Sequence, residues 1–135
     1  MIEYRSELTG IAATDLDGFF EGWPTTPLPA DLLRVLGDSA HRFLALDRDR
    51  VVGFVYAISD GLFSAYIPLL EVRSSHRGQG IGTELVRRLL SGLSDLYMVD
   101  VVCDPDLADF YERFGLARLA GMAWRNPAAE VVRPH

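Results

Sequence analysis

The chain contains no lysine, so all 13 of its basic residues are arginines. They stand against 19 acidic residues, which leaves a formal net charge of −6. Nucleic-acid binding by phosphate neutralisation needs a basic surface, so this balance argues against a nucleic-acid partner. It favours a cationic or amine-bearing partner, and it means that any anionic ligand needs a local site.

Cysteine is almost absent too, and Cys103 is the only one. A single cysteine forms neither an internal disulfide nor a zinc cluster, so no metal site is expected, and the chain suits a reducing cytoplasm. No apolar run approaches the roughly eighteen residues that span a bilayer. Residues 1–10 lack the cationic start and apolar core of a secretory signal. We therefore expect a cytoplasmic protein without a membrane partner.

The apolar patterns predict one α/β domain over residues 1–125, followed by a mobile tail over residues 126–135. Three strands joined by short turns are expected to form an antiparallel meander in a mixed sheet with helices on both faces. The predicted strands are 2–8, 41–47, 51–59, 64–72, 96–103 and 116–124, the last as a strand or hairpin. The predicted helices are 30–36, 80–93, 106–113 and a short first one that Thr14 caps.

The clearest chemical signal is the loop Arg77-Gly78-Gln79-Gly80-Ile81-Gly82-Thr83, between a predicted strand and a predicted helix. Such a junction points backbone N–H groups and the positive end of the helix dipole at one spot, and glycines let a phosphate approach them. We interpret the loop as a polyanion site; a turn needed only for close packing is the alternative. A Walker loop needs lysine and a dinucleotide fingerprint needs glycine at position 83, so both nucleotide motifs are excluded.

Arg77-Gly78-Gln79-Gly80-Ile81-Gly82 resembles the R/Q-x-x-G-x-G/A signature of the GNAT superfamily of acyl-CoA-dependent N-acyltransferases. The resemblance extends upstream to Leu70-Glu71-Val72 and downstream to residues 109–116, which are similar to the family's tyrosine-containing segment. The order of the predicted elements also matches. The resemblance implies a GNAT-like α/β fold: a mixed, mostly antiparallel sheet of six or seven strands, splayed between the fourth and fifth strands, with helices on both faces.

In that family the loop amides hold the pyrophosphate of coenzyme A, so the resemblance implies acetyl-CoA as the co-substrate. The pantetheine arm would lie between the splayed strands, where a backbone N–H would polarise the thioester carbonyl. Pro68 has no N–H to donate, which indicates a bulge or splay in its strand. The residues implied to bind the co-substrate are Leu70, Glu71, Val72, Arg77, Gly78, Gln79, Gly80, Ile81, Gly82, Thr83, Asp104 and Tyr111. Gln79, Gly80 and Gly82 are the expected main-chain donors.

Tyr111 matches the family's usual general acid, which would protonate the departing thiolate; packing of its short helix is the alternative role. Glu71 is the expected base because it is the only carboxylate in its strand, with a solvated surface carboxylate as the alternative. Asp104 matches a position where many relatives carry an asparagine that contacts pantetheine, but an ionised aspartate accepts hydrogen bonds without donating them. We interpret His76 as a surface or phosphate contact and Cys103 as a small core residue.

The first two helices and their connection wall the acceptor side in this fold, which implies Glu21 and Trp23 as substrate-binding residues. A carboxylate beside an aromatic ring suits an ammonium ion. The connection is short for the family, so the wall is either open or completed by a second subunit of a homodimer. The sequence thus predicts an N-acetyltransferase that moves an acetyl group from acetyl-CoA to a primary amine by direct attack in a ternary complex. A non-catalytic acyl-CoA-binding module is the alternative.

Overall fold

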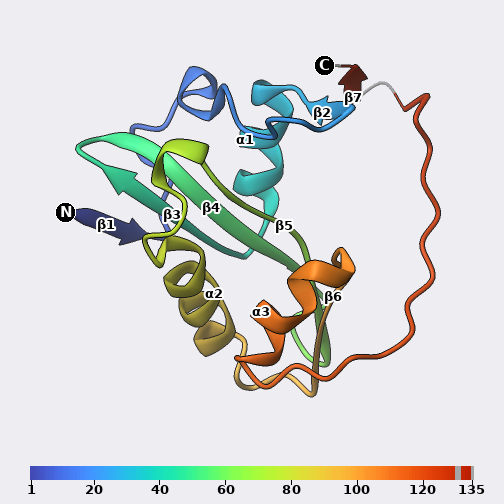
Figure 1. Ribbon diagram of the computed structural model, residues 1–135. Coiled ribbons are helices and arrows are strands. Elements are labelled where there is room, and N and C mark those ends of the chain that lie inside the picture. The colour runs from blue at the N-terminus through green and yellow to red at the C-terminus, as the bar shows by residue number, and fades with distance from the viewer. Residues whose placement is uncertain (130–131, 135) are drawn as a thin grey trace.

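The computed structural model describes residues 1–129 and 132–134, and its centre is a mixed five-stranded sheet (Figure 1). The spatial order is β1-β3-β4-β5-β6, antiparallel throughout except for the parallel pair β5–β6. The strands are β1 (Ile2–Arg5), β3 (His41–Asp47), β4 (Arg50–Ser59), β5 (Ser64–Val72) and β6 (Met98–Val101). The antiparallel meander β3–β4–β5 is therefore confirmed.

The predicted count of six or seven strands in this sheet is wrong, because residues 116–126 form no strand. Outside the sheet, β2 (Thr25–Pro27) pairs with β7 (Val132–Pro134) as a separate antiparallel ribbon. The sequence did not predict strand β2 because three prolines lie in or near it, and proline donates no backbone hydrogen bond to a strand ladder.

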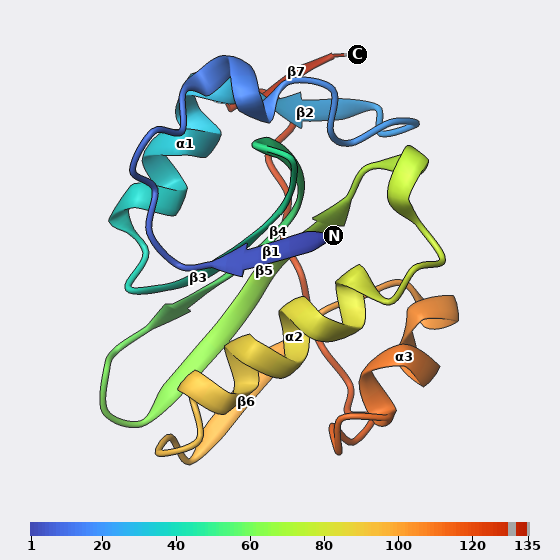
Figure 2. The ribbon, with the colours of Figure 1, turned by 90° about the vertical axis from the view of Figure 1, so that its left-hand side faces the viewer.

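Helices cover both faces of the sheet, as predicted (Figure 2). The 3-10 helix η1 (Ala13–Leu16) and helix α1 (Pro29–Asp38) pack on one face, and helix α2 (Ile81–Gly92) packs on the other. Successive residues of a strand point to opposite faces. Phe54 of β4 accordingly lies in the core with α1, and Val55 lies in the core with α2. Each face therefore has its own apolar core.

Local sequence explains where these helices begin. Pro29 occupies the first turn of α1, where a missing N–H costs nothing. The carboxylate of Asp15 accepts a hydrogen bond from the Ala12 N–H at 2.8 Å at the start of η1, so the predicted cap at Thr14 is wrong.

A methyl group on Gly53 would lie 3.2 Å from Leu85 of α2, so glycine there allows α2 to approach β4 closely.

The predicted irregularity at Pro68 is confirmed. In the pairing of β4 with β5, Tyr56 faces Leu69 and Ile58 faces Tyr66, so β5 places one extra residue in this interval and forms a bulge. Pairing with β6 ends at Ile67, opposite Val101. Beyond this point β5 continues to Val72 without β6 beside it, which leaves one edge of residues 68–72 open.

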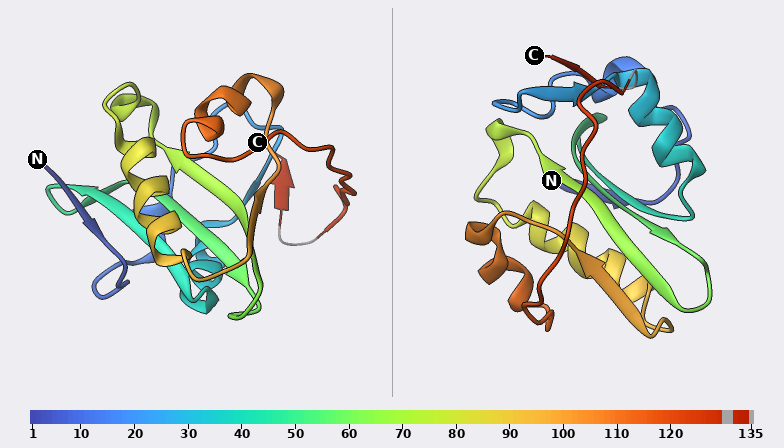
Figure 3. Two further views of the ribbon diagram at one scale, coloured as in Figure 1. Left: turned by 90° about the horizontal axis from the view of Figure 1, so that it is seen from below. Right: turned by 90° about the vertical axis from the view of Figure 1, so that its right-hand side faces the viewer.

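Two short 3-10 helices and one α-helix complete the fold: η2 (Ser74–His76), η3 (Pro105–Leu107) and α3 (Ala108–Glu112). Helix α3 lies beside the region where β5 and β6 separate (Figure 3, left). Among the described residues, every helix is too short or too polar to cross a membrane.

Candidate active site

A pocket of about 610 Å³ opens where β5 separates from β6, between the start of α2 and helix α3. Three segments that are distant in sequence meet in it: the end of β5, the glycine loop and α3. The residues that line it are Leu70, Glu71, Val72, His76, Arg77, Gly78, Gly80, Ile81, Gly82, Thr83, Leu107, Phe110, Tyr111 and Arg113.

Most of the residues expected at the co-substrate site therefore face one cavity. Gln79 and Asp104 do not line it, and neither do Glu21 and Trp23 of the expected acceptor wall. The pocket also contains Leu107, Phe110 and Arg113, to which the sequence analysis gave no role. Leu107 precedes Tyr111 by four residues and Phe110 by three, and this helical spacing is the signal that would have placed Leu107 beside both.

The glycine loop has a backbone conformation that depends on its glycines. Gly78 and Gly80 have φ values of 77° and 81°, a left-handed conformation that side-chain-bearing residues rarely adopt. Gly80 is the N-cap of α2 and has no side chain to cover the free N–H groups of the first helical turn. The Arg77 Nε donates to the Val72 carbonyl at 3.2 Å, which ties the loop to the end of β5.

Two arginines and a histidine lie at the pocket. Arg77 and Arg113 line the cavity together with His76. The His76 ring is held at both nitrogens: Nε2 lies 2.8 Å from a carboxylate oxygen of Asp47, and Nδ1 lies 2.7 Å from the Ser75 hydroxyl. The hydrogen bond from His76 lowers the pKa of Asp47, so this carboxylate stays charged beside the imidazole.

Glu71 lies on the same strand but in a different environment. Burial raises the pKa of its carboxyl group above the usual value; the charge of Arg77 and a hydrogen bond from the Phe20 backbone oppose this effect without cancelling it. Phe20 itself is buried with φ at 68°, an uncommon conformation for a residue that is not glycine. The segment before β2 thus bends sharply where it meets Glu71.

Tyr111 is buried in α3, and only 7% of its surface is exposed. Burial raises the pKa of its phenol to about 12, and the nearby charges of Cys103, Glu71 and Tyr66 add to this effect. The ring packs edge-on against Phe110, another residue of the pocket wall. The Tyr111 hydroxyl therefore keeps its proton at neutral pH in an environment that it shares with Glu71.

Arg73 connects this region to the expected acceptor side. Its guanidinium donates to the carbonyl oxygens of Val51, Asp17 and Asp15 at 2.6, 2.7 and 3.0 Å. It also lies over the Phe19 ring, 4.2 Å from the centroid. Arg73 therefore fastens the segment after η1 to the sheet. Trp23 packs against Phe20, the residue whose backbone donates to Glu71, with the ring centroids 5.2 Å apart. Trp23 itself does not line the pocket.

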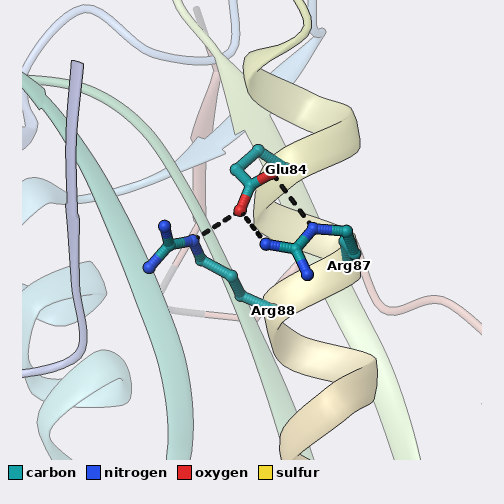
Figure 4. Close-up of polar contacts among 3 residues, drawn as sticks. All are labelled: Glu84, Arg87 and Arg88. Atoms are coloured by element: carbon teal, nitrogen blue, oxygen red, sulfur yellow. Dashed lines mark hydrogen bonds and ion pairs between the residues drawn. The ribbon is translucent and has the colours of Figure 1, made fainter. Parts of the chain in front are cut away.

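A second glutamate near the loop, Glu84 of α2, is engaged in surface ion pairs (Figure 4). Its carboxylate accepts hydrogen bonds from Arg88 Nε at 2.7 Å and from Arg87 Nε at 3.1 Å. These bonds lower the pKa of Glu84 to about 2. Glu84 lies in the first turn of α2, where a negative charge also favours the helix dipole.

Comparison with known proteins agrees with this architecture. Residues 8–116 match the model of the acetyltransferase (GNAT) family. The structure superposes on a candidate acetyltransferase from Deinococcus radiodurans R1 with a TM-score of 0.88 and 50% sequence identity, covering 92% of this chain and 87% of that one. A GNAT family acetyltransferase from Streptococcus pneumoniae gives a TM-score of 0.73 at 27% identity, covering 94% and 98% of the two chains.

Among characterised sequences, the chain is similar to N-alpha-acetyltransferase 30 of Schizosaccharomyces pombe, with 32% identity over 85 residues. That match covers 56% of this chain and 57% of the yeast protein. A histone acetyltransferase of Glycine max is 28% identical over 76% of this chain and 52% of its own length. The chain thus spans a little over half the length of these two relatives. The family match extends over most of the chain, and the chain belongs to the acetyltransferase (GNAT) family.

Proposed function

We propose that this protein is an N-acetyltransferase that transfers an acetyl group from acetyl-CoA to a primary amine by direct attack in a ternary complex. One observation carries the proposal: the glycine loop, the open edge of β5 and Tyr111 line a single pocket. Family membership supports acetyl-CoA as the co-substrate. The acidic chain supports an amine acceptor, because an ammonium ion is attracted to a surface of negative net charge.

The pocket offers suitable partners for each part of acetyl-CoA. Backbone amides at Gln79, Gly80 and Gly82 would hold the pyrophosphate at the start of α2, with Arg77 and Arg113 beside it. The open edge of β5 would hydrogen-bond the pantetheine arm in the manner of an added strand. Bound acetyl-CoA supplies the acetyl group as a thioester. A backbone N–H from residues 70–72 would polarise its carbonyl.

Glu71 is proposed as the base that takes a proton from the acceptor ammonium. Its raised pKa makes it a better proton acceptor than an exposed glutamate, and its Phe20 hydrogen bond holds the carboxylate next to the acceptor side. The carboxylate has no arginine ion pair among the described residues, so no strong partner competes with an incoming amine.

Tyr111 is proposed to assist departure of the thiolate. A phenol with a pKa of about 12 is a weaker acid than a thiol of roughly 8.5. Full proton transfer from Tyr111 to sulfur is therefore uphill, and the larger part of its effect is a hydrogen bond that stabilises the negative charge developing on sulfur. A hydroxyl held in a buried site provides such a bond without reorganisation of water.

The acceptor is proposed to be a small-molecule, peptide or protein amine. The name of one relative, a histone acetyltransferase, refers to a protein acceptor, and the name of another, an N-alpha-acetyltransferase, refers to an alpha-amine. Glu21 and Trp23 are also proposed as acceptor contacts. To reach Glu71, an amine would have to pass the segment that contains Phe20, which Arg73 holds against the sheet. A short wall of this kind suits an extended peptide end better than an enclosed ligand.

The direct test is release of coenzyme A thiol from acetyl-CoA across a panel of aminoglycosides, polyamines, amino acids and peptide N-termini. The proposal predicts turnover with at least one class of primary amine. A folded protein that acetyl-CoA stabilises against heat but that turns over no acceptor would instead be an acyl-CoA-binding module. Absence of any thermal shift with acetyl-CoA would reject the binding site itself.

A further inference from the structure

Residues 17–23 link η1 to β2 and pack on the face of the sheet that carries α1. The backbone of this segment is left-handed at Gly18, Phe20 and Gly22, with φ values of 82°, 68° and 82°. A residue that bears a side chain keeps such a conformation only where its surroundings hold it there. Contacts from outside the segment must therefore fix the backbone at Phe20.

The sheet contacts both phenylalanine rings of this segment through Phe54 of β4. Phe19 and Phe20 meet Phe54 edge-on, with ring centroids 5.1 and 6.2 Å away. Both rings are almost completely buried, with 5% and 3% of their surface exposed. Apolar packing is not directional, so it anchors these side chains without fixing where the Phe20 backbone N–H points.

Arg73 fixes the backbone of the chain that leads into the same segment. Its Nη1 and Nη2 bind the carbonyl oxygens of Asp17 and Asp15, while its Nε binds the carbonyl oxygen of Val51 on β4. An added Cβ on Gly18 would lie only 3.1 Å from Nη1, so the chain passes directly over the guanidinium. Because this group is a planar, rigid fork, its bonds set the position of the segment relative to the sheet.

Glu71 contacts the segment from the end of β5, two residues before Arg73 in the sequence. It pairs with Phe54 across β4 and β5, and paired residues share a face, so its side chain lies on the face where Phe20 is buried. The Phe20 backbone donates a hydrogen bond to the Glu71 carboxylate. Since Arg73 holds the chain at Asp17, three residues before Phe20, it determines where this donor lies.

Arg73 is connected to the pocket through this segment alone. Glu71 lines the pocket and Arg73 does not. The charged and titratable groups that act on Glu71 include Arg77 of the glycine loop and Tyr111 of α3. Arg73 instead lies near the charges of Asp15, Asp17, Glu21 and Arg50. A change at Arg73 is therefore expected to reach the pocket by moving the segment.

We propose that Arg73 is a positioning residue for the amine acceptor. Its guanidinium holds the chain before Phe20, so that the Phe20 N–H directs the Glu71 carboxylate into the pocket. The same contacts hold Glu21 and Trp23, the proposed acceptor contacts, beside the path of the amine. This inference rests on the proposed acetyl transfer. It predicts that loss of the guanidinium impairs use of the amine and leaves acetyl-CoA binding intact.

Steady-state kinetics with one amine and acetyl-CoA tests this pattern. Arg73→Gln is expected to lower kcat/KM for the amine by about 10- to 100-fold, the usual consequence of a misplaced reacting group. The KM for the amine should rise and kcat should fall, because the segment carries acceptor contacts and also directs the base. Calorimetry is expected to find near wild-type affinity for acetyl-CoA. The matched control is Arg50→Gln, which removes a neighbouring positive charge at an exposed position of β4 and should keep wild-type kinetics.

Arg73→Lys separates the charge of the side chain from its geometry. One ammonium group cannot bind the three carbonyl oxygens as the guanidinium does, so this variant should also lose about 10-fold in kcat/KM for the amine. Because it keeps the positive charge, it provides the same test if Arg73→Gln does not fold. Wild-type amine kinetics in either folded variant, or a parallel loss of acetyl-CoA affinity, would overturn the proposal.

Tryptophan fluorescence tests the position of the segment without catalysis. Trp124→Phe leaves Trp23 as the only tryptophan, and Trp23 packs against Phe20. In this background Arg73→Gln is expected to increase the quenching of Trp23 by acrylamide, and Arg50→Gln is expected to leave it unchanged. Unchanged quenching in Arg73→Gln would reject the positioning role even if the wild type transfers acetyl groups. A wild type that turns over no amine would instead reject the proposed acetyl transfer, and with it any role of Arg73 toward an acceptor.

Discussion

Glu71 and Glu84 lie near the same loop, yet their carboxyl groups are perturbed in opposite directions. Glu84 on the outer face of α2 binds two arginines, and its pKa falls to about 2 (Figure 4). Glu71 at the end of β5 is half-buried and held by one backbone hydrogen bond, and its pKa rises. The first carboxylate is stabilised by its neighbours, and the second is destabilised.

The difference agrees with a structural role for Glu84 and with the chemical role proposed for Glu71. A carboxylate that forms strong ion pairs binds a further proton poorly, whereas one that burial has made more basic binds it readily. Glu71 also lies in the pocket with Tyr111, while Glu84 lies outside it. The comparison predicts that equivalent changes at the two glutamates will have different consequences.

The largest effect is expected for Glu71→Gln. Removing the base while keeping the shape of the side chain should lower kcat by about 10²- to 10⁴-fold, the usual contribution of general base catalysis. Steady-state thiol release measures this, with Glu84→Gln as the matched control of near wild-type rate. Comparable kcat values for Glu71→Gln and Glu84→Gln would contradict the different roles proposed for the two glutamates.

A new carboxylate in the loop should act on binding instead of chemistry. Gly82→Asp places a negative charge in the first turn of α2, where the pyrophosphate is proposed to bind, and should weaken acetyl-CoA binding by about 100-fold or more. Gly82→Ala is the control, since an added Cβ would lie 3.8 Å from Val72 and 3.9 Å from Phe110, an ordinary contact distance. Calorimetry should find that the Gly82→Ala variant binds acetyl-CoA with near wild-type affinity. Equal acetyl-CoA affinities for the Gly82→Ala and Gly82→Asp variants would mean that the loop does not hold phosphate.

A smaller effect is expected for Tyr111→Phe. Tyr111 is proposed to donate a hydrogen bond to the leaving thiolate, and loss of this bond should lower kcat by about 10- to 100-fold with little change in acetyl-CoA affinity. Tyr97→Phe, at an exposed tyrosine outside the pocket, is the control. An unchanged kcat in single-turnover measurements would remove Tyr111 from the mechanism.

The smallest effects concern stability, and they should differ in sign. The raised pKa of Glu71 means that the folded protein favours the protonated carboxyl group. The contribution of this group to the free energy of unfolding is therefore lost as pH rises through the folded pKa. Because glutamine stays neutral, Glu71→Gln should stabilise the protein at neutral pH. The lowered pKa of Glu84 gives stability above about pH 4.5 that is lost as pH falls toward 2. Glu84→Gln should therefore cost about 0.5–1 kcal/mol at neutral pH for its two exposed pairs.

Urea unfolding at pH 7 and pH 3 measures both changes. The gain from Glu71→Gln should disappear at pH 3, where the native carboxyl is already protonated. The loss from Glu84→Gln should become smaller there and should also shrink in high salt. Two variants that are destabilised alike at pH 7 would contradict the assignment of Glu71 as a strained, buried carboxylate.

Local patterns in the sequence were sufficient for the parts of the fold on which the site depends. The spacing of Ile81, Leu85 and Leu89 predicts α2 and its buried face, and Pro68 predicts the bulge in β5. Both are consequences of neighbouring residues: a 3.6-residue period in one case and a missing N–H in the other. The glycine loop followed from the same short-range logic and from the family resemblance.

The parts that the sequence did not predict depend on contacts between distant segments. The hydrogen bond between Phe20 and Glu71 joins residues far apart in the sequence, and it contributes to the environment of the proposed base. The pairing of β2 with β7 likewise joins segments that lie far apart in the sequence, Thr25–Pro27 and Val132–Pro134. Residues 116–124 were expected to form a strand or hairpin and form neither; the segment contains three alanines and one glycine and no β-branched residue, a composition that favours a strand only weakly.

The most direct test of the central claim is the pH dependence of thiol release by the wild type, Glu71→Gln and Glu84→Gln with one amine acceptor. We predict that kcat/KM of the wild type and of Glu84→Gln rises with pH along the same acidic limb, with a midpoint above the ordinary glutamate pKa of about 4.3. Glu71→Gln should lose this limb together with most of the rate. A Glu71→Gln variant that keeps both the limb and the rate would contradict the account.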